Sequence, residues 1–201
     1  MLAVAVSVQL SVASESGAGR VVAGRFTLVE LLGTGSMGAV YRAVEAPMGR
    51  EVALKILHAD RAIDGNARAR FLREATTMSR LSSPHTVRVL DFGEAEGGGL
   101  FIAMELLHGE SLAARLRRLG RFDVESAFGA IRQVLKSLAE AHAKGIIHRD
   151  LKPANLFFAQ TPGAPGDEII KVLDFGVAKL TEKEGSAAFG QTLAGTVLGT
   201  P

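Results

Sequence analysis

The sequence contains no cysteine, no block of like charge and no long hydrophobic run among its 201 residues. Without cysteine the chain can form neither a disulfide framework nor a thiolate metal site, which fits the reducing environment of the cytoplasm. The 23 basic residues are scattered and the formal net charge is +2, so nothing indicates binding to nucleic acid or to a membrane surface. With 47% apolar and 22% charged residues, the composition is typical of a soluble globular protein.

Residues 2–12 are mostly apolar, but they predict neither a secretory signal nor a membrane helix. No lysine or arginine precedes Arg20, and a transmembrane helix needs about 20 consecutive apolar residues. We expect residues 1–24 to be an N-terminal extension, either flexible or carrying an extra strand. Residues 14–19 are rich in serine and glycine and would form a flexible joint. The sequence therefore predicts no membrane segment in this chain.

The hydrophobic pattern changes from strand-like to helical along the chain. Alternating and β-branched segments predict an antiparallel meander and then a second strand pair, over residues 26–31, 39–44, 51–57, 87–92 and 100–106. Helical spacing predicts helices over residues 64–81, 111–119 and 123–143. Phe71, Ala75 and Met78 share one face of the first helix, and Asp123 is a plausible N-cap of the last. This order predicts an α+β protein with two lobes.

Gly33, Gly35 and Gly38 match the pattern G-x-G-x-x-G, which alone is a weak signal. Glycine lets backbone N–H groups approach phosphates because no Cβ is in the way. In a dinucleotide-binding fold this loop opens a helix, with an acidic residue about 20 positions later, and Glu51 lies near that distance. Residues 39–44 alternate in polarity, however, so we expect the loop to join two strands and to cover phosphates as a flap. A purely structural hairpin is the remaining alternative.

Two charged residues and two short motifs follow the glycine loop. Lys55 lies on a predicted strand from which it could reach phosphates, and Glu74 lies on the next predicted helix, where it could pair with Lys55. Either residue could also be an ordinary solvated charge. The string HRDLKPAN at residues 148–155 and the string DFG at residues 174–176 are far more specific, because a chance match to both is very improbable.

These motifs resemble those of the protein kinase family, and more closely those of bacterial serine/threonine kinases that look like the eukaryotic ones. The resemblance runs from about residue 25 to residue 201. It implies an antiparallel-sheet N-lobe with one main helix, and a hinge, over residues 25–107. Residues 108–201 would be a partial, mainly helical C-lobe with the catalytic loop and the start of the activation segment. ATP and Mg²⁺ are the implied cofactors, and serine or threonine hydroxyls of proteins are the implied substrates.

The resemblance also implies a role for each polar residue. Asp150 would orient the substrate hydroxyl and accept its proton, and Lys152 would stabilise charge on the transferring γ-phosphoryl group. Lys152 is in addition the family's mark of serine/threonine specificity. Asn155 and Asp174 would hold Mg²⁺, a hard cation that takes oxygen ligands. Lys55 and Glu74 would complete the catalytic set.

An adenine site is implied as well. Met104 would be the gatekeeper, and Glu105 to Leu107 would be the hinge whose backbone binds the base. The apolar walls of the site would come from Leu32, Val40, Ala53, Leu156 and Leu173.

Residues 91–93 repeat the tripeptide Asp-Phe-Gly, but they precede the hinge, so we expect a strand end followed by a turn there. Arg149 beside Asp150 resembles the arrangement in kinases that are activated by phosphorylation after Asp174. Thr192 and Thr196 are the candidates for self-phosphorylation.

The resemblance fails at the end of the sequence, where the family's A-P-E motif and large C-lobe helices do not follow Pro201. In the family those helices would bury the apolar face of the helix expected over residues 123–143. We therefore weigh an active, C-terminally truncated kinase domain against an inactive fragment that binds nucleotide or another protein. The intact Lys55, Asp150, Asn155 and Asp174 favour catalytic ancestry.

Overall fold

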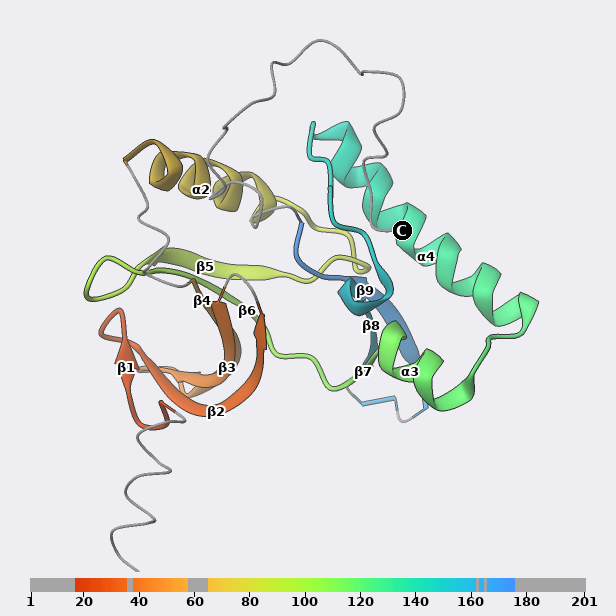
Figure 1. Ribbon diagram of the computed structural model, residues 1–201, viewed down its shortest axis with the longest axis horizontal. Helices are drawn as coiled ribbons and strands as arrows, with labels where there is room; N and C mark the ends of the chain where they lie inside the picture. Colours follow the sequence, from red (N-terminus) through yellow and green to blue (C-terminus); the bar gives the residue numbers. More distant parts are fainter. Residues whose placement is uncertain (1–16, 36–37, 58–64, 162, 165, 176–201) are drawn as a thin grey trace, which may run out of the picture. The chain divides into compact units, whose positions relative to one another are not determined.

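A computed structural model describes residues 17–35, 38–57, 65–161, 163–164 and 166–175 (Figure 1). The chain divides into two compact units. The first contains the residues up to 62 together with 89–106, and the second contains residues 63–88 and those from 107 onward.

The first unit is built on a curled sheet of six strands in the order β1-β2-β3-β4-β6-β5, all antiparallel to their neighbours (Figure 1). The strands are β1 (Val21–Val22), β2 (Phe26–Gly35), β3 (Gly38–Glu45), β4 (Arg50–Leu57), β5 (Val89–Glu94) and β6 (Leu100–Glu105). Side chains alternate between the two faces of a strand. One face therefore forms the core, in which Leu28, Ala43, Val52, Leu54 and Ala103 are buried. The short β1 lies within the segment 1–24.

The glycine loop joins two paired strands, as the alternating pattern after it predicts. Gly33 pairs with Val40 and Gly35 pairs with Gly38 across β2 and β3. Residues 36 and 37 lie outside the described residues. The strand β3 follows the loop directly where that fold would have a helix, and this excludes the dinucleotide-binding interpretation.

The three glycines of the loop differ in what surrounds them. A Cβ on Gly38 would lie 2.0 Å from the carbonyl oxygen of Ile56 on β4, so only glycine fits there. A Cβ on Gly33 or Gly35 would have no heavy atom within 4 Å. Packing against β4 therefore requires glycine at position 38. Packing sets no such requirement at positions 33 and 35, where a ligand could approach the backbone.

Within its described residues, the second unit combines three helices and a short 3-10 turn with a three-stranded sheet in the order β7-β8-β9. Its elements are α2 (Gly65–Met78), β7 (Gly109–Ser111), α3 (Leu112–Leu119), α4 (Val124–Ala143), η1 (Pro153–Asn155), β8 (Leu156–Gln160) and β9 (Glu168–Val172). The predicted face of α2 is buried at Phe71, Ala75 and Met78. The predicted N-cap of α4 is present, because the Asp123 side chain accepts a hydrogen bond from Ser126 N at 2.8 Å.

Helix α4 has two apolar faces with different surroundings. Val134, Ser137 and Ala141 are buried, and α4 contacts β9. On another face Val124, Phe128, Ile131 and Leu135 are each more than half exposed. Some of these side chains line an apolar groove of about 410 Å³ together with residues of α3. Within the described residues nothing covers that groove.

We expect Gly38→Ala to lower the free energy of unfolding by on the order of 2 kcal/mol, because its Cβ would overlap the β4 backbone. Gly35→Ala should change the free energy of unfolding by less than about 1 kcal/mol, because its Cβ would meet no heavy atom within 4 Å. The change should be toward higher stability, because alanine restricts the unfolded chain. Urea unfolding of the two variants and the wild type checks both values. Equal destabilisation by the two substitutions would contradict the assignment.

Candidate active site

The sheet of the first unit presents the predicted nucleotide-contacting residues on the face opposite its core. Val40 pairs with Lys55 across β3 and β4, and Ala53 pairs with Met104 across β4 and β6. Ala53 and Lys55 alternate with the buried Val52 and Leu54, so their side chains leave the other side of the sheet. The result is a largely apolar surface that carries one ammonium group. Leu32, near the glycine loop, is about half exposed.

The predicted hinge follows the end of β6. Glu105 is the last residue of that strand and pairs with Val52. Leu107 is the first residue after the first unit. The stretch from Glu105 to Leu107 thus links the two units along the chain, as a hinge would.

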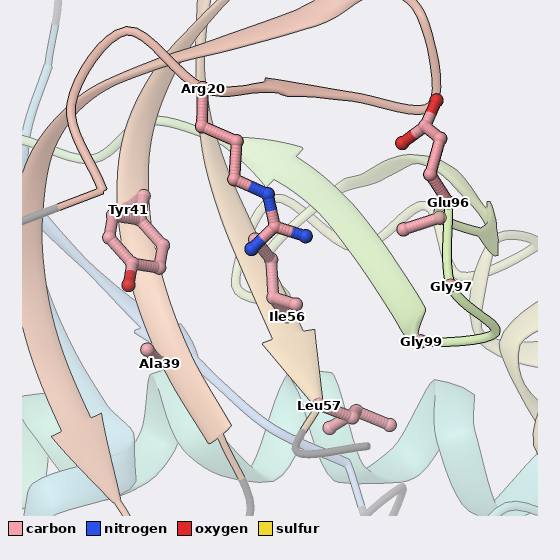
Figure 2. Close-up of a pocket in the computed structure, with 9 residues that line it drawn as sticks. Arg20, Ala39, Tyr41, Ile56, Leu57, Glu96, Gly97 and Gly99 are labelled. Carbon is pink, nitrogen blue, oxygen red and sulfur yellow. The ribbon is translucent and has the colours of Figure 1, made fainter. Parts of the chain in front are cut away.

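A separate pocket of about 240 Å³ lies on the core face of the same sheet (Figure 2). Ala39, Tyr41 and Ile56 line it, and these residues alternate with Val40 and Lys55. Figure 2 shows the Arg20 guanidinium between Tyr41 and Glu96. Because these side chains leave the opposite face from Lys55, the pocket is not part of the predicted nucleotide surface.

The first Asp-Phe-Gly tripeptide has a structural role. Residues 91–93 lie inside β5 rather than at a strand end, which corrects the predicted position. Asp91 forms an ion pair with Arg25, which also binds Glu45 at 3.1 Å. The carboxylate of Asp91 thus belongs to an ionic cluster of the first unit.

In the second unit the catalytic-loop string forms a compact hydrogen-bonded turn. The Asp150 carboxylate accepts hydrogen bonds from Lys152 Nζ at 2.9 Å and from Asn155 Nδ2 at 3.1 Å. Asn155 Nδ2 also donates to the Asp150 carbonyl at 2.8 Å. Burial alone would raise the pKa of Asp150, but the bonds from Lys152 and Asn155 outweigh it and lower that pKa below its usual range. At neutral pH Asp150 is therefore an ionised, acceptor-only group.

His148 has a role that the sequence patterns did not reveal. Its ring is buried, its Nε2 lies 2.8 Å from the Leu173 carbonyl oxygen, and its Nδ1 accepts the Asp150 N–H at 3.3 Å. One neutral tautomer satisfies both contacts, with Nε2–H as the donor and Nδ1 as the acceptor. Burial lowers the pKa of His148, although the Leu173 carbonyl and the nearby Asp150 and Asp174 carboxylates oppose this. The ring also packs on Phe175, with centroids 4.8 Å apart.

The two predicted metal ligands lie on segments that are bonded to one another. Leu173 N donates to the Asn155 carbonyl at 2.9 Å, and the Leu173 carbonyl accepts from His148. This anchors the residue immediately before Asp174. Because Nδ2 of Asn155 faces Asp150, its Oδ1 remains to ligate a cation.

An amide oxygen and a carboxylate suit Mg²⁺, which is usually bound by one or two protein oxygens together with phosphates and waters. Across the part of the chain that the structure describes, no group of three His, Cys, Asp or Glu side chains could hold a metal by itself. The donors present therefore fit a cation that arrives with a phosphate ligand.

Glu74 lies on α2, in the second unit, and is close enough to the catalytic loop for the charge of Arg149 to affect its pKa. Burial raises the pKa of Glu74, while the guanidinium groups of Arg149 and Arg73 act in the opposite direction. Lys55 belongs to the first unit, and its pairing with Glu74 stays a prediction. Leu156, a predicted wall residue, begins β8 and pairs with Val172, one residue before Leu173.

Three comparisons with known proteins point to the same family. Residues 26–201 match the family described as Protein kinase domain. The chain is 42% identical over 185 residues to Serine/threonine-protein kinase pkn3 of Myxococcus xanthus, covering 91% of this chain and 33% of that protein. The crystal structure of a double mutant of the Mycobacterium tuberculosis PknI kinase domain superposes with a TM-score of 0.71 at 32% identity, covering 80% of this chain and 62% of that one. Rad53 gives a TM-score of 0.65 at 27% identity, covering 77% and 39%.

The chain belongs to the protein kinase family, and the relatives that it matches include bacterial serine/threonine kinases. The predicted α+β fold of this family, with an antiparallel-sheet lobe and a partial, mainly helical one, is confirmed. The chain spans about a third of the length of the curated relative pkn3. Among the described helices, none has both the length and the apolar character needed to cross a membrane.

We predict that His148 makes stability depend on pH. An unfolded imidazole has a pKa of about 6.5, and the folded pKa is lower, so the folded state binds fewer protons. The stability that neutral His148 confers is fully present above about pH 6.5 and is lost as the pH falls through the lower, folded pKa. The difference in free energy of unfolding between wild type and His148→Gln should therefore shrink on acidification. Urea unfolding at several pH values measures it, and a difference independent of pH would contradict the prediction.

Proposed function

We propose that this chain transfers the γ-phosphoryl group of ATP to serine or threonine hydroxyls of proteins. The observation that carries the proposal is the Asp150 carboxylate, held by Lys152 and Asn155 next to the segment that ends in Asp174. Phosphoryl transfer asks a protein mainly for positioned groups and charge stabilisation, and this turn supplies both.

The proposed ATP site follows the residue pattern of the family. Among the described residues, no heavy atom lies within 4 Å of a Cβ built on Gly33 or Gly35, which supports the use of this backbone over phosphates. Lys55 would bind the α- and β-phosphates, with Glu74 as its partner. The base would lie among the wall residues Leu32, Val40, Ala53, Met104, Leu156 and Leu173, bonded to the backbone of Glu105 and Leu107. The Rad53 structure contains AMP-PNP, an analogue of ATP, which supports nucleotide binding in this family.

The proposed chemistry assigns one task to each polar group. Asp150 orients the substrate hydroxyl and takes its proton, and Lys152 stabilises charge on the transferred group. Mg²⁺ bound by Asn155 and Asp174 would neutralise phosphate charge. Lys152 would then have two roles, because its ammonium group also bonds to the Asp150 carboxylate.

We also propose the domain limits that the family implies, namely an extension over residues 1–24, an N-lobe with its hinge over 25–107 and a partial C-lobe over 108–201. A cytoplasmic location would suit a kinase that uses cellular ATP and has no cysteine. Residues 1–16 and 176–201 lie outside the described residues.

The alternative function is that of a module that binds nucleotide or a protein without catalysis. The exposed apolar side chains of α4 and the groove beside them favour it, because surfaces of this kind often bind partners. The complete set of candidate catalytic residues favours the kinase.

The first test is a γ-phosphate transfer assay on the 201-residue chain and two asparagine variants. Asp150→Asn should lower transfer by at least about 100-fold, because it removes the acceptor that positions the hydroxyl. Asp167→Asn is the matched control, because Asp167 is exposed in the turn before β9, and it should leave transfer unchanged. Equal transfer by wild type and Asp150→Asn would rule out catalysis by this chain.

Self-phosphorylation would involve Thr192 or Thr196, and a phosphate there would pair with Arg149. Both threonines lie outside the described residues. After incubation with ATP and Mg²⁺, mass spectrometry should find phosphate on at least one of them in the wild type and on neither in Asp150→Asn. An active wild type with both residues unmodified would remove this part of the proposal.

A further inference from the structure

The carboxylate of Glu140 binds a loop that is remote from it in the sequence. Glu140 lies in the last turns of α4, and it accepts hydrogen bonds from Ser83 N at 2.7 Å, Ser82 N at 2.9 Å and Ser82 Oγ at 2.9 Å. Ser82 and Ser83 belong to the loop between α2 and β5. Two adjacent backbone N–H groups that converge on one carboxylate form a charge-assisted anchor for that loop.

Lys144, the C-cap residue of α4, completes this anchor. Its Nζ donates to Glu140 at 2.7 Å and to the carbonyl of Arg80 at 2.6 Å. The anion therefore binds N–H groups of the loop, and the cation binds a carbonyl of the same loop. We call Glu140 and Lys144 the α4 clamp.

The contacts of the α4 clamp favour the ionised form of Glu140. Burial acts to raise the pKa of Glu140, but Lys144, Ser82 and Ser83 together lower it to about 2. Glu140 is therefore ionised across the range in which enzymes work. A second contact on the same face of α4 supports the loop, because Thr86 Oγ1 and Ser137 Oγ are 2.7 Å apart and buried.

Along the chain, the α4 clamp is connected to two parts of the candidate active site. On one side, Leu81 and Met78 are buried and Leu81 N donates to the Met78 carbonyl, so the bound loop continues directly from α2. Glu74 lies one helical turn before Met78. On the other side, only residues 145–147 separate Lys144 from His148 at the start of the catalytic loop.

We propose that Glu140 is a positioning residue for phosphoryl transfer, because the α4 clamp fixes the end of α2, and with it Glu74, at the catalytic loop. The inference rests on the proposed kinase function for its kinetic consequence. Its structural part, the fixing of α2, does not depend on that function.

A double-mutant cycle tests the kinetic consequence. Glu140→Gln keeps the size of the side chain but removes the charge that binds the two N–H groups and Lys144. We expect kcat to fall roughly tenfold, the scale of coupling through one positioned element. In a Glu74→Gln background the same change should cost less than about twofold, because the residue being positioned is already lost. Glu125→Gln, an exposed carboxylate in the first turn of α4, is the matched control and should leave kcat unchanged in both backgrounds.

Full activity of Glu140→Gln would overturn the proposal. So would an equal loss of kcat in both backgrounds, because a general loss of stability acts independently of Glu74. If Glu140→Gln fails to fold, Lys144→Gln removes the other half of the α4 clamp and should show the same dependence on Glu74 at a smaller amplitude.

Hydrogen exchange separates a failure of this proposal from a failure of the proposed function. Amides of residues 71–83 should exchange at least about fivefold faster in Glu140→Gln than in Glu125→Gln, because loss of the anchor lets the loop open. Unchanged exchange would overturn the positioning role whether or not the wild type transfers phosphate. Faster exchange in a chain without transferase activity would uphold the clamp and reject only the proposed function.

Discussion

The arrangement of the candidate site depends on one neutral imidazole. The His148 ring accepts the Asp150 N–H with one nitrogen and donates to the Leu173 carbonyl with the other, across 25 residues of sequence. The bond to Leu173 joins the catalytic loop to the residue that follows β9 and precedes Asp174. A further bond, from Leu173 N to the Asn155 carbonyl, links the same two segments.

The same network holds backbone conformations that are otherwise unfavourable. Arg149 and Asp174 both have positive φ, at 61° and 49°, in the left-handed region that non-glycine residues seldom adopt. Such conformations cost on the order of 1 to 3 kcal/mol and persist only where the surroundings require them. Here the flanking bonds supply that requirement, since Asp150 N also donates to the His148 carbonyl at 2.8 Å. Arg149 directly precedes Asp150, and both Asp150 and Asp174 lie outside the helices and strands.

The sequence predicted what depends on local pattern. The alternation in residues 39–44 predicted β3, and helical spacing with Asp123 predicted α4 and its cap. It did not reveal the role of His148, the need for glycine at position 38 or the link from Glu140 to Ser82. Each of these depends on a contact with a distant segment, 58 residues away in the case of Glu140. Periodicity carries no information about such contacts. For the same reason the first Asp-Phe-Gly tripeptide could be separated from the second only by its place in the chain.

The electrostatics of Asp150 indicate what kind of catalyst this turn can be. A general base is strongest when its pKa lies near the working pH, but the bonds from Lys152 and Asn155 lower the pKa of Asp150. Asp150 is therefore a weaker base than an ordinary aspartate, but in exchange its carboxylate is ionised and fixed in place. That exchange would suit the proposed phosphoryl transfer, because a loose transition state needs an aligned hydroxyl more than an early loss of its proton. The bonds that lower the pKa of Asp150 are the same ones that hold its carboxylate in place, so this turn favours orientation of the carboxylate over its proton affinity.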